Sequence, residues 1–171
     1  MSPTKIETPR EFFDHVVRKD VDEFRSNATD LRLAYHACTS LLSLRDWIAH
    51  EHKKKSWTHS GRLQSPFSTP NNLRAALKNI DDRFGIVTDI ANASKHMVLD
   101  PNRPRDTELW GNANTEVHFT GYVGFAPLGA VPLGGSASVI MVKIGSHHHD
   151  VLDCVNAVHS IWEQLMIENG W

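Results

Sequence analysis

The sequence has little cysteine: its 171 residues include only Cys38 and Cys154. Neither has a second cysteine at the spacing of a metal-binding or redox motif, which argues against both kinds of cysteine site. Each falls inside a predicted helix, on or near its apolar face. We therefore expect two buried free thiols, which fit a reducing compartment.

Long apolar runs are also missing. No stretch approaches the roughly 20 apolar residues that a helix needs to cross a bilayer. The first residues, MSPTKIETPREFF, lack the apolar segment of a signal peptide. We therefore expect no membrane partner and a cytoplasmic protein.

The chain has no strong net charge. Its formal charge is -2, with 40% hydrophobic residues, 22% charged residues and eleven histidines. Such a composition is neither that of a disordered chain nor that of a strongly basic one, so any contact with nucleic acid must come from a local patch. The length predicts one domain.

Apolar residues repeat at three- and four-residue steps over several stretches, which is the pattern of amphipathic helices. Thr8 and Glu11 form a capping box before the first stretch, and the segment from Asn27 to Asp30 supplies a turn and an N-cap for the second. The segment from Ser56 to Pro70 has the composition of a loop. The expected helices run from Pro9 to about Phe24, from Leu31 to Lys55, from Asn71 to Ile80, from about Arg83 to Leu99, and from about Asp150 to Glu168.

The period changes after residue 114. Glu116 to Phe125 alternates apolar and polar residues, and Ala137 to Ile144 is rich in β-branched residues, so both are predicted strands. We interpret them as an antiparallel hairpin whose tip is the loop 126–135. The expected fold is therefore mainly α, a bundle of about five helices with a β-hairpin inserted before the C-terminal helix. The hairpin either covers one end of the helical core or binds a partner through its tip.

The second predicted helix ends in residues that conflict with its apolar stripe. Arg45 and His52 continue the core face, whereas Asp46 and His50 project from the other side. Arg45 and His50 have the spacing R-x4-H, and His52 satisfies a looser R-x6-H spacing. This pattern resembles the motif of the HEPN superfamily, helical-bundle proteins that include many metal-independent ribonucleases. The resemblance implies a homodimer that pairs two such motifs and cleaves RNA by attack of the ribose 2′-hydroxyl.

These residue types suit that chemistry on their own. An unperturbed histidine titrates near pH 6.5 and exchanges protons at neutral pH, while arginine keeps its charge and stabilises a phosphorane-like transition state. We therefore assign His50 as general acid or base, Arg45 as electrostatic stabiliser and Asp46 as orienter, with His52 as the alternative imidazole. The structural alternatives are an Arg45 that pairs with Asp89 and a His52 that interacts with the helix C-terminus.

Two further groups lie beside this motif in our interpretation. Asp89, Asn92 and His96 share a polar edge of the fourth predicted helix and either support the site or form a buried hydrogen-bond network. Asn92 and His96 also retain the N-x3-H half of the motif, although Ala91 stands where the family has arginine. The basic run Lys53, Lys54 and Lys55 with Trp57 combines cations with a ring that stacks on an unpaired base, and its alternative is a solvated helix end.

Histidine is abundant, but its spacing does not predict a metal centre. Neither His50, His52 and His59 nor His147 to His149 with Asp150 matches a zinc motif. We expect no metal and no cofactor. The two functions left open are a HEPN-like protein that binds or cleaves RNA, and a non-catalytic module that binds a protein through the hairpin tip or a helical face.

Overall fold

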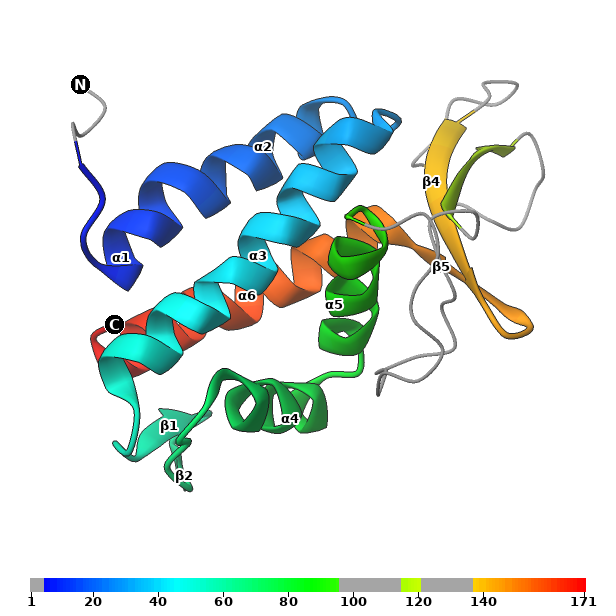
Figure 1. Ribbon diagram of the computed structural model, residues 1–171. Coiled ribbons are helices and arrows are strands. Elements are labelled where there is room, and N and C mark those ends of the chain that lie inside the picture. Colours follow the sequence, from blue (N-terminus) through cyan, green and yellow to red (C-terminus); the bar gives the residue numbers. More distant parts are fainter. Residues whose placement is uncertain (1–4, 96–114, 121–136) are drawn as a thin grey trace.

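The computed structural model describes residues 5–95, 115–120 and 137–171. Within this part the chain is mainly helical, with two small antiparallel sheets. Helices α3 and α6 lie side by side, and the N-terminal helix packs against both (Figure 1). The helical bundle with a β-hairpin before the last helix, predicted from the sequence, is confirmed.

The N-terminal helix is one continuous segment made of α1 (Pro9–Phe12), the π-helical turn η1 (Phe13–Val17) and α2 (Arg18–Ser26). It starts with the predicted capping box: the Glu11 amide donates to Thr8 Oγ1 over 3.2 Å, and the Thr8 amide donates to Glu11 Oε2 over 3.1 Å. One apolar stripe of this helix is fully buried and consists of Phe13, Val17, Val21 and Phe24.

Helix α3 (Leu31–His52) is the central element and contacts α2, α4, α5 and α6. Asp30 caps it, since its Oδ1 accepts hydrogen bonds from the amides of Arg32 and Leu33 at 2.8 and 3.3 Å. The helix ends before the predicted Lys55. The backbone leaves the helical conformation at Lys53 and turns left-handed at Lys54, which has a φ of 65°.

The segment after α3 was predicted to be a loop, and this was wrong for part of it. Strands β1 (Trp57–His59) and β2 (Arg62–Gln64) pair antiparallel in this segment. Ser60 and Gly61 connect them with φ values of 51° and 71°, and two successive positive φ values are the geometry of a tight type I′ hairpin turn. The same chain segment therefore forms a small hairpin next to the end of α3.

Helices α4 (Pro70–Ile80) and α5 (Arg83–Ala93) follow. The fourth predicted helix was expected to reach Leu99, but α5 ends at Ala93 and residues 94–95 form a turn; residues 96–99 lie outside the described residues. Thr69 caps α4 through a 3.2 Å bond from the Asn72 amide. The Arg83 guanidinium joins Asp81, 2.7 Å away, to Asp153 of the last helix, 3.1 Å away. Helix α5 is thereby fixed to α6 at its start, and most of its residues are buried.

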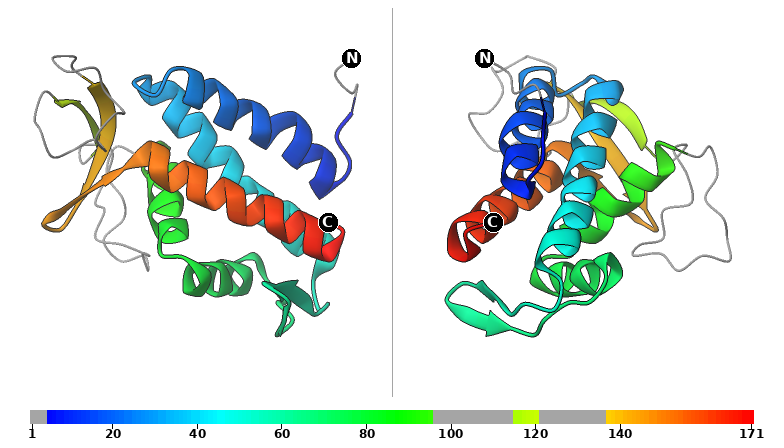
Figure 2. Two further views of the ribbon diagram at one scale, coloured as in Figure 1. Left: turned by 180° about the vertical axis from the view of Figure 1, so that it is seen from behind. Right: turned by 60° about the vertical axis from the view of Figure 1, so that its left-hand side comes forward.

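The second sheet has the strand order β3 (Thr115–Thr120), β4 (Ala137–Ile144) and β5 (His147–Asp150), all antiparallel. The first two strands form the predicted hairpin, whose tip lies outside the described residues. The histidine run His147 to His149 belongs to β5, which pairs with β4 across the turn at Gly145 and Ser146. The sheet lies at the N-terminal end of α6, and β1–β2 lies near the opposite end (Figure 2).

Helix α6 (Val151–Asn169) closes the bundle. Asp150 caps its start, and Gly170, with a φ of 63°, ends it in a left-handed turn. Trp171 then folds back and is only 7% exposed. Both cysteines are free and buried, as predicted. No helix in the described part of the chain is long and apolar enough to span a membrane.

Candidate functional site

Arg45 and Asp46 form a hydrogen-bonded ion pair near the end of α3. Arg45 Nε and Nη2 both donate to Asp46 Oδ1, over 3.0 and 2.7 Å. The Arg45 side chain is 14% exposed, whereas that of Asp46 is 55% exposed. The stem of the arginine is thus covered while its guanidinium reaches a carboxylate at the surface. The sequence left open an ion pair between Arg45 and Asp89. The two hydrogen bonds at 3.0 and 2.7 Å join Arg45 to the adjacent Asp46.

His50 lies one helical turn beyond Asp46 and is exposed. Residues four apart are neighbours on a helix surface. Arg45 and His50 leave the helix about 140° apart, since each residue turns it by about 100°. The arginine side chain nevertheless bends to Asp46, which lies one helical turn before His50.

His52 occupies a different environment. Its ring stacks on Trp171 with 5.6 Å between the ring centroids, and its side chain is 14% exposed. Its Nε2 is 3.7 Å from the nearest Glu51 oxygen and has no hydrogen-bond partner among the residues that the structure describes. Burial lowers the pKa of His52 and favours its neutral form. Of the two imidazoles left open by the sequence, the one that faces solvent is therefore His50.

The three lysines after α3 form an ordered turn with exposed side chains. The Lys54 amide donates to the Phe67 carbonyl over 2.7 Å, and the Lys55 amide donates to the His52 carbonyl over 3.2 Å. These bonds fix the backbone of the turn next to the helix C-terminus, where cations interact favourably with the helix dipole. The turn holds positive charge one to two helical turns from His50.

Trp57 does not have the role that the sequence predicted for it. The ring is 2% exposed, and its Nε1 donates to the Ser65 carbonyl over 3.0 Å. It packs 6.1 Å from the ring of Trp171. Stacking on an unpaired base needs an open ring face, so the prediction that Trp57 binds RNA was wrong. This tryptophan anchors the β1–β2 hairpin to the core.

The polar cluster predicted on α5 belongs to the helix interface as far as it is described. Asp89 is 3% exposed and Asn92 is partly buried, on a helix that packs against α3. His96, the third member, lies outside the described residues. Asp89 is thus buried, whereas Asp46 and His50 of the motif are exposed.

Metal binding finds no support in the described geometry. Within residues 5–95, 115–120 and 137–171, no group of three or more His, Cys, Asp or Glu side chains is placed to hold a metal ion. His147 and His148 are exposed on β5, and the Asp150 carboxylate caps α6. We therefore assign none of these side chains as a metal ligand.

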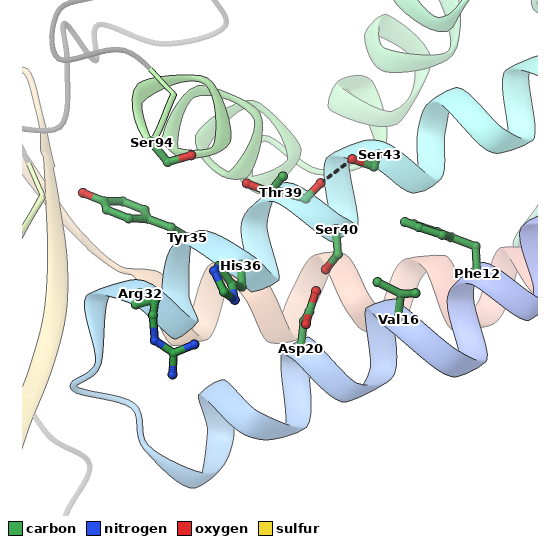
Figure 3. A pocket seen from close by; sticks show the side chains of 10 residues that line it. All are labelled: Phe12, Val16, Asp20, Arg32, Tyr35, His36, Thr39, Ser40, Ser43 and Ser94. Carbon is green, nitrogen blue, oxygen red and sulfur yellow. Dashed lines mark hydrogen bonds between the residues drawn. The ribbon is translucent and has the colours of Figure 1, made fainter. Parts of the chain in front are cut away.

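A groove of about 640 Å³ opens between the N-terminal helix and α3 (Figure 3). Phe12, Val16 and Asp20 line one side, and His36 and Ser40 project from α3 on the other. Burial raises the pKa of Asp20, while the Ser40 hydroxyl and the His36 ring act in the opposite direction. A carboxyl group with a shifted pKa inside a cleft is a candidate binding group.

Sequence reasoning missed this groove. The proximity of His36 to Asp20 depends on how two helices pack, which no local pattern reveals. The only local signal is the four-residue spacing of His36 and Ser40, which puts both on one face.

Comparisons of the chain with protein-family models, with curated proteins and with solved structures found no match.

Proposed function

We propose that this protein is a HEPN-like RNA-binding protein that cleaves RNA without a metal ion, using Arg45, Asp46 and His50. One observation carries the proposal: the Arg45 guanidinium is held 2.7 Å from Asp46, one turn from an exposed imidazole. In the proposal, Arg45 supplies a permanent positive charge, Asp46 is the orienting carboxylate and His50 transfers the proton.

In the proposed reaction, neutral His50 accepts the proton of a ribose 2′-hydroxyl, and the 2′ oxygen attacks the adjacent phosphorus. The bond from phosphorus to the 5′ oxygen breaks, leaving a 2′,3′-cyclic phosphate and a 5′-hydroxyl. Arg45 stabilises the charge on the phosphorane-like transition state. Asp46 keeps the guanidinium in position.

The reaction also explains why a homodimer is part of the proposal. The entering and leaving oxygens lie on opposite sides of the phosphorus, so one imidazole cannot contact both. A second copy of the chain, with its own motif facing the first, supplies an imidazolium that protonates the leaving oxygen. The proton taken from the 2′-hydroxyl and the proton given to the 5′ oxygen then balance.

The lysine turn supplies the RNA-binding part of the proposal. Lys53, Lys54 and Lys55 are exposed next to the motif, and phosphate contacts by lysine dominate non-specific affinity for nucleic acids. Because the net charge of the chain is slightly negative, this patch concentrates positive charge where the scissile phosphate has to lie. We expect binding that weakens steeply as the salt concentration rises.

The test is cleavage of a labelled RNA of mixed sequence in excess EDTA. The wild type and the His147→Ala control, which removes an exposed histidine on β5, should cleave equally. His50→Ala should reduce the rate about 100-fold or more, as expected for loss of a general acid or base, and Arg45→Ala by a similar factor. Circular dichroism shows whether each variant is folded.

A further variant separates the two imidazoles. His52→Phe keeps an aromatic ring against Trp171 and removes the nitrogens, so it should retain the wild-type rate. Equal cleavage by the wild type and His50→Ala would mean that a contaminant or another site is responsible. Loss of activity in His52→Phe with full activity in His50→Ala would mean that His52 and not His50 takes part in the reaction, and would contradict the proposal.

A further inference from the structure

Asp20 is a partly buried carboxyl group that faces the groove between the N-terminal helix and α3 (Figure 3). Other carboxylates of this helix are paired: Asp14 contacts Arg10 and Arg18, and Asp22 contacts Arg25. Among the described residues, no ion pair includes Asp20. A carboxylate taken from water without a cation is destabilised, and a cation in the groove would offset that cost.

The hydroxyl groups around the groove present acceptors as well. Ser43 donates its hydrogen to the Thr39 carbonyl over 2.8 Å, and Ser94 donates to the Ala91 carbonyl over 2.8 Å. A serine whose single hydrogen is already used offers only oxygen lone pairs to a ligand. These groove-lining groups therefore match a ligand rich in N–H donors.

Positive charge at the edge of the groove is engaged elsewhere. Arg32 also lines the groove, but its guanidinium is 3.8 Å from the Asp30 carboxylate. His36 is the titratable group of α3 nearest to Asp20. The negative centre of the groove is thus left to a ligand.

An apolar surface begins directly next to Asp20. Val16 and Phe12 precede Asp20 on the same helix and line the groove with it (Figure 3). The Phe12 ring is held by stacking on Trp47, with 5.1 Å between centroids. A groove with a carboxylate at one point, apolar side chains beside it and a fixed aromatic ring beyond them favours an amphipathic molecule.

We propose that this groove binds a small organic cation, an ammonium group joined by a short linker to an aromatic body. The ammonium group donates to the Asp20 carboxylate, and the aromatic body lies over Val16 towards Phe12. The groove volume of about 640 Å³ is in the range of small-molecule sites. The proposal does not depend on RNA cleavage, because no residue of the α3 motif lines the groove.

The test is a titration of the full-length 15N-labelled protein with 2-phenylethylamine, followed by NMR. We expect saturable shifts of the amides around Asp20 and Ser40. The neutral analogue 2-phenylethanol should bind at least tenfold more weakly, since it has the same ring and linker without the charge. Asp20→Asn should weaken amine binding at least tenfold while its spectrum remains that of a folded protein.

Two control variants locate the effect. Asp22→Asn removes an exposed carboxylate of the same helix that is paired with Arg25, and it should leave the affinity unchanged. His50→Ala should also bind the amine normally, so a failed nuclease assay leaves this result intact. The proposal is overturned if no saturable shift occurs, if the alcohol binds as tightly as the amine, or if Asp20→Asn and Asp22→Asn have equal effects.

Discussion

Replacing Asn169 by alanine should detach the β1–β2 hairpin from α6. The Asn169 side chain binds the outer edge of β1 at both backbone groups of Thr58. Its Oδ1 accepts from the Thr58 amide over 2.6 Å, and its Nδ2 donates to the Thr58 carbonyl over 2.9 Å. A third bond, from Nδ2 to the Leu165 carbonyl over 2.9 Å, holds the side chain against its own helix.

The expected loss of stability follows from these three bonds. Each contributes about 0.5–1.5 kcal/mol net, and water replaces part of what is lost because the site is only partly buried. We expect the Asn169→Ala substitution to lower the free energy of unfolding by about 2 kcal/mol. For a chain of this size, that corresponds to a lowering of Tm by about 4–8 °C.

Thermal denaturation followed by circular dichroism measures this change. Ile167→Ala is the matched control on the same helix, because Ile167 is 75% exposed and should leave Tm nearly unchanged. Hydrogen exchange should show faster exchange in residues 57–64 of the Asn169 variant and unchanged exchange in α3. A Tm within 1 °C of the wild type, or faster exchange spread evenly over all helices, would refute this account of the hairpin.

Three further predictions concern single groups. Burial lowers the pKa of His159, whose Nε2 lacks a hydrogen-bond partner within the described part of the chain. The unfolded chain therefore binds more protons below about pH 6.5, and the free energy of unfolding should fall as the pH drops. Urea unfolding at pH 7.5 and 5.5 should show a smaller loss in His159→Phe than in the wild type, and an equal loss would contradict this. Cys38 and Cys154 are buried, and burial raises the pKa of both thiols, that of Cys154 to about 12. Ellman's reagent at pH 8 should therefore react with them only after denaturation. Rapid reaction of the folded protein would disprove this. Lys54 has a φ of 65°, a left-handed conformation that glycine adopts without the cost that a Cβ imposes. Lys54→Gly should therefore raise the free energy of unfolding by about 1 kcal/mol, whereas Lys54→Ala should not. A lower Tm for the glycine variant would contradict this prediction.

Local signals were sufficient to predict the helices. The capping box at Thr8 and Glu11, the N-cap Asp30 and the apolar stripes act within one or two turns of the chain, so their effects can be read from neighbouring residues. The β1–β2 hairpin could not be predicted in this way. Its strands have three residues each, too few to show a period, and the hairpin is fixed by contacts of Trp57 and Thr58 with the distant end of α6.

The same distinction holds for the candidate sites. The Arg45–Asp46 bond joins adjacent residues, and the motif that contains it was visible as a break in the apolar stripe of α3. The burial of Trp57 was not visible, because a lysine run next to an aromatic residue has the same local pattern whether the ring is open or covered. The groove at Asp20 depends on the packing of two helices and was missed altogether.

The most direct test of the proposed reaction compares an RNA with the same sequence carrying 2′-O-methyl groups, both incubated with the wild-type protein in EDTA. If His50 activates the 2′-hydroxyl, the unmodified RNA should be cut to products ending in 2′,3′-cyclic phosphate, and the methylated RNA should remain intact. Cleavage of both molecules at the same rate, or of neither, would contradict the proposal.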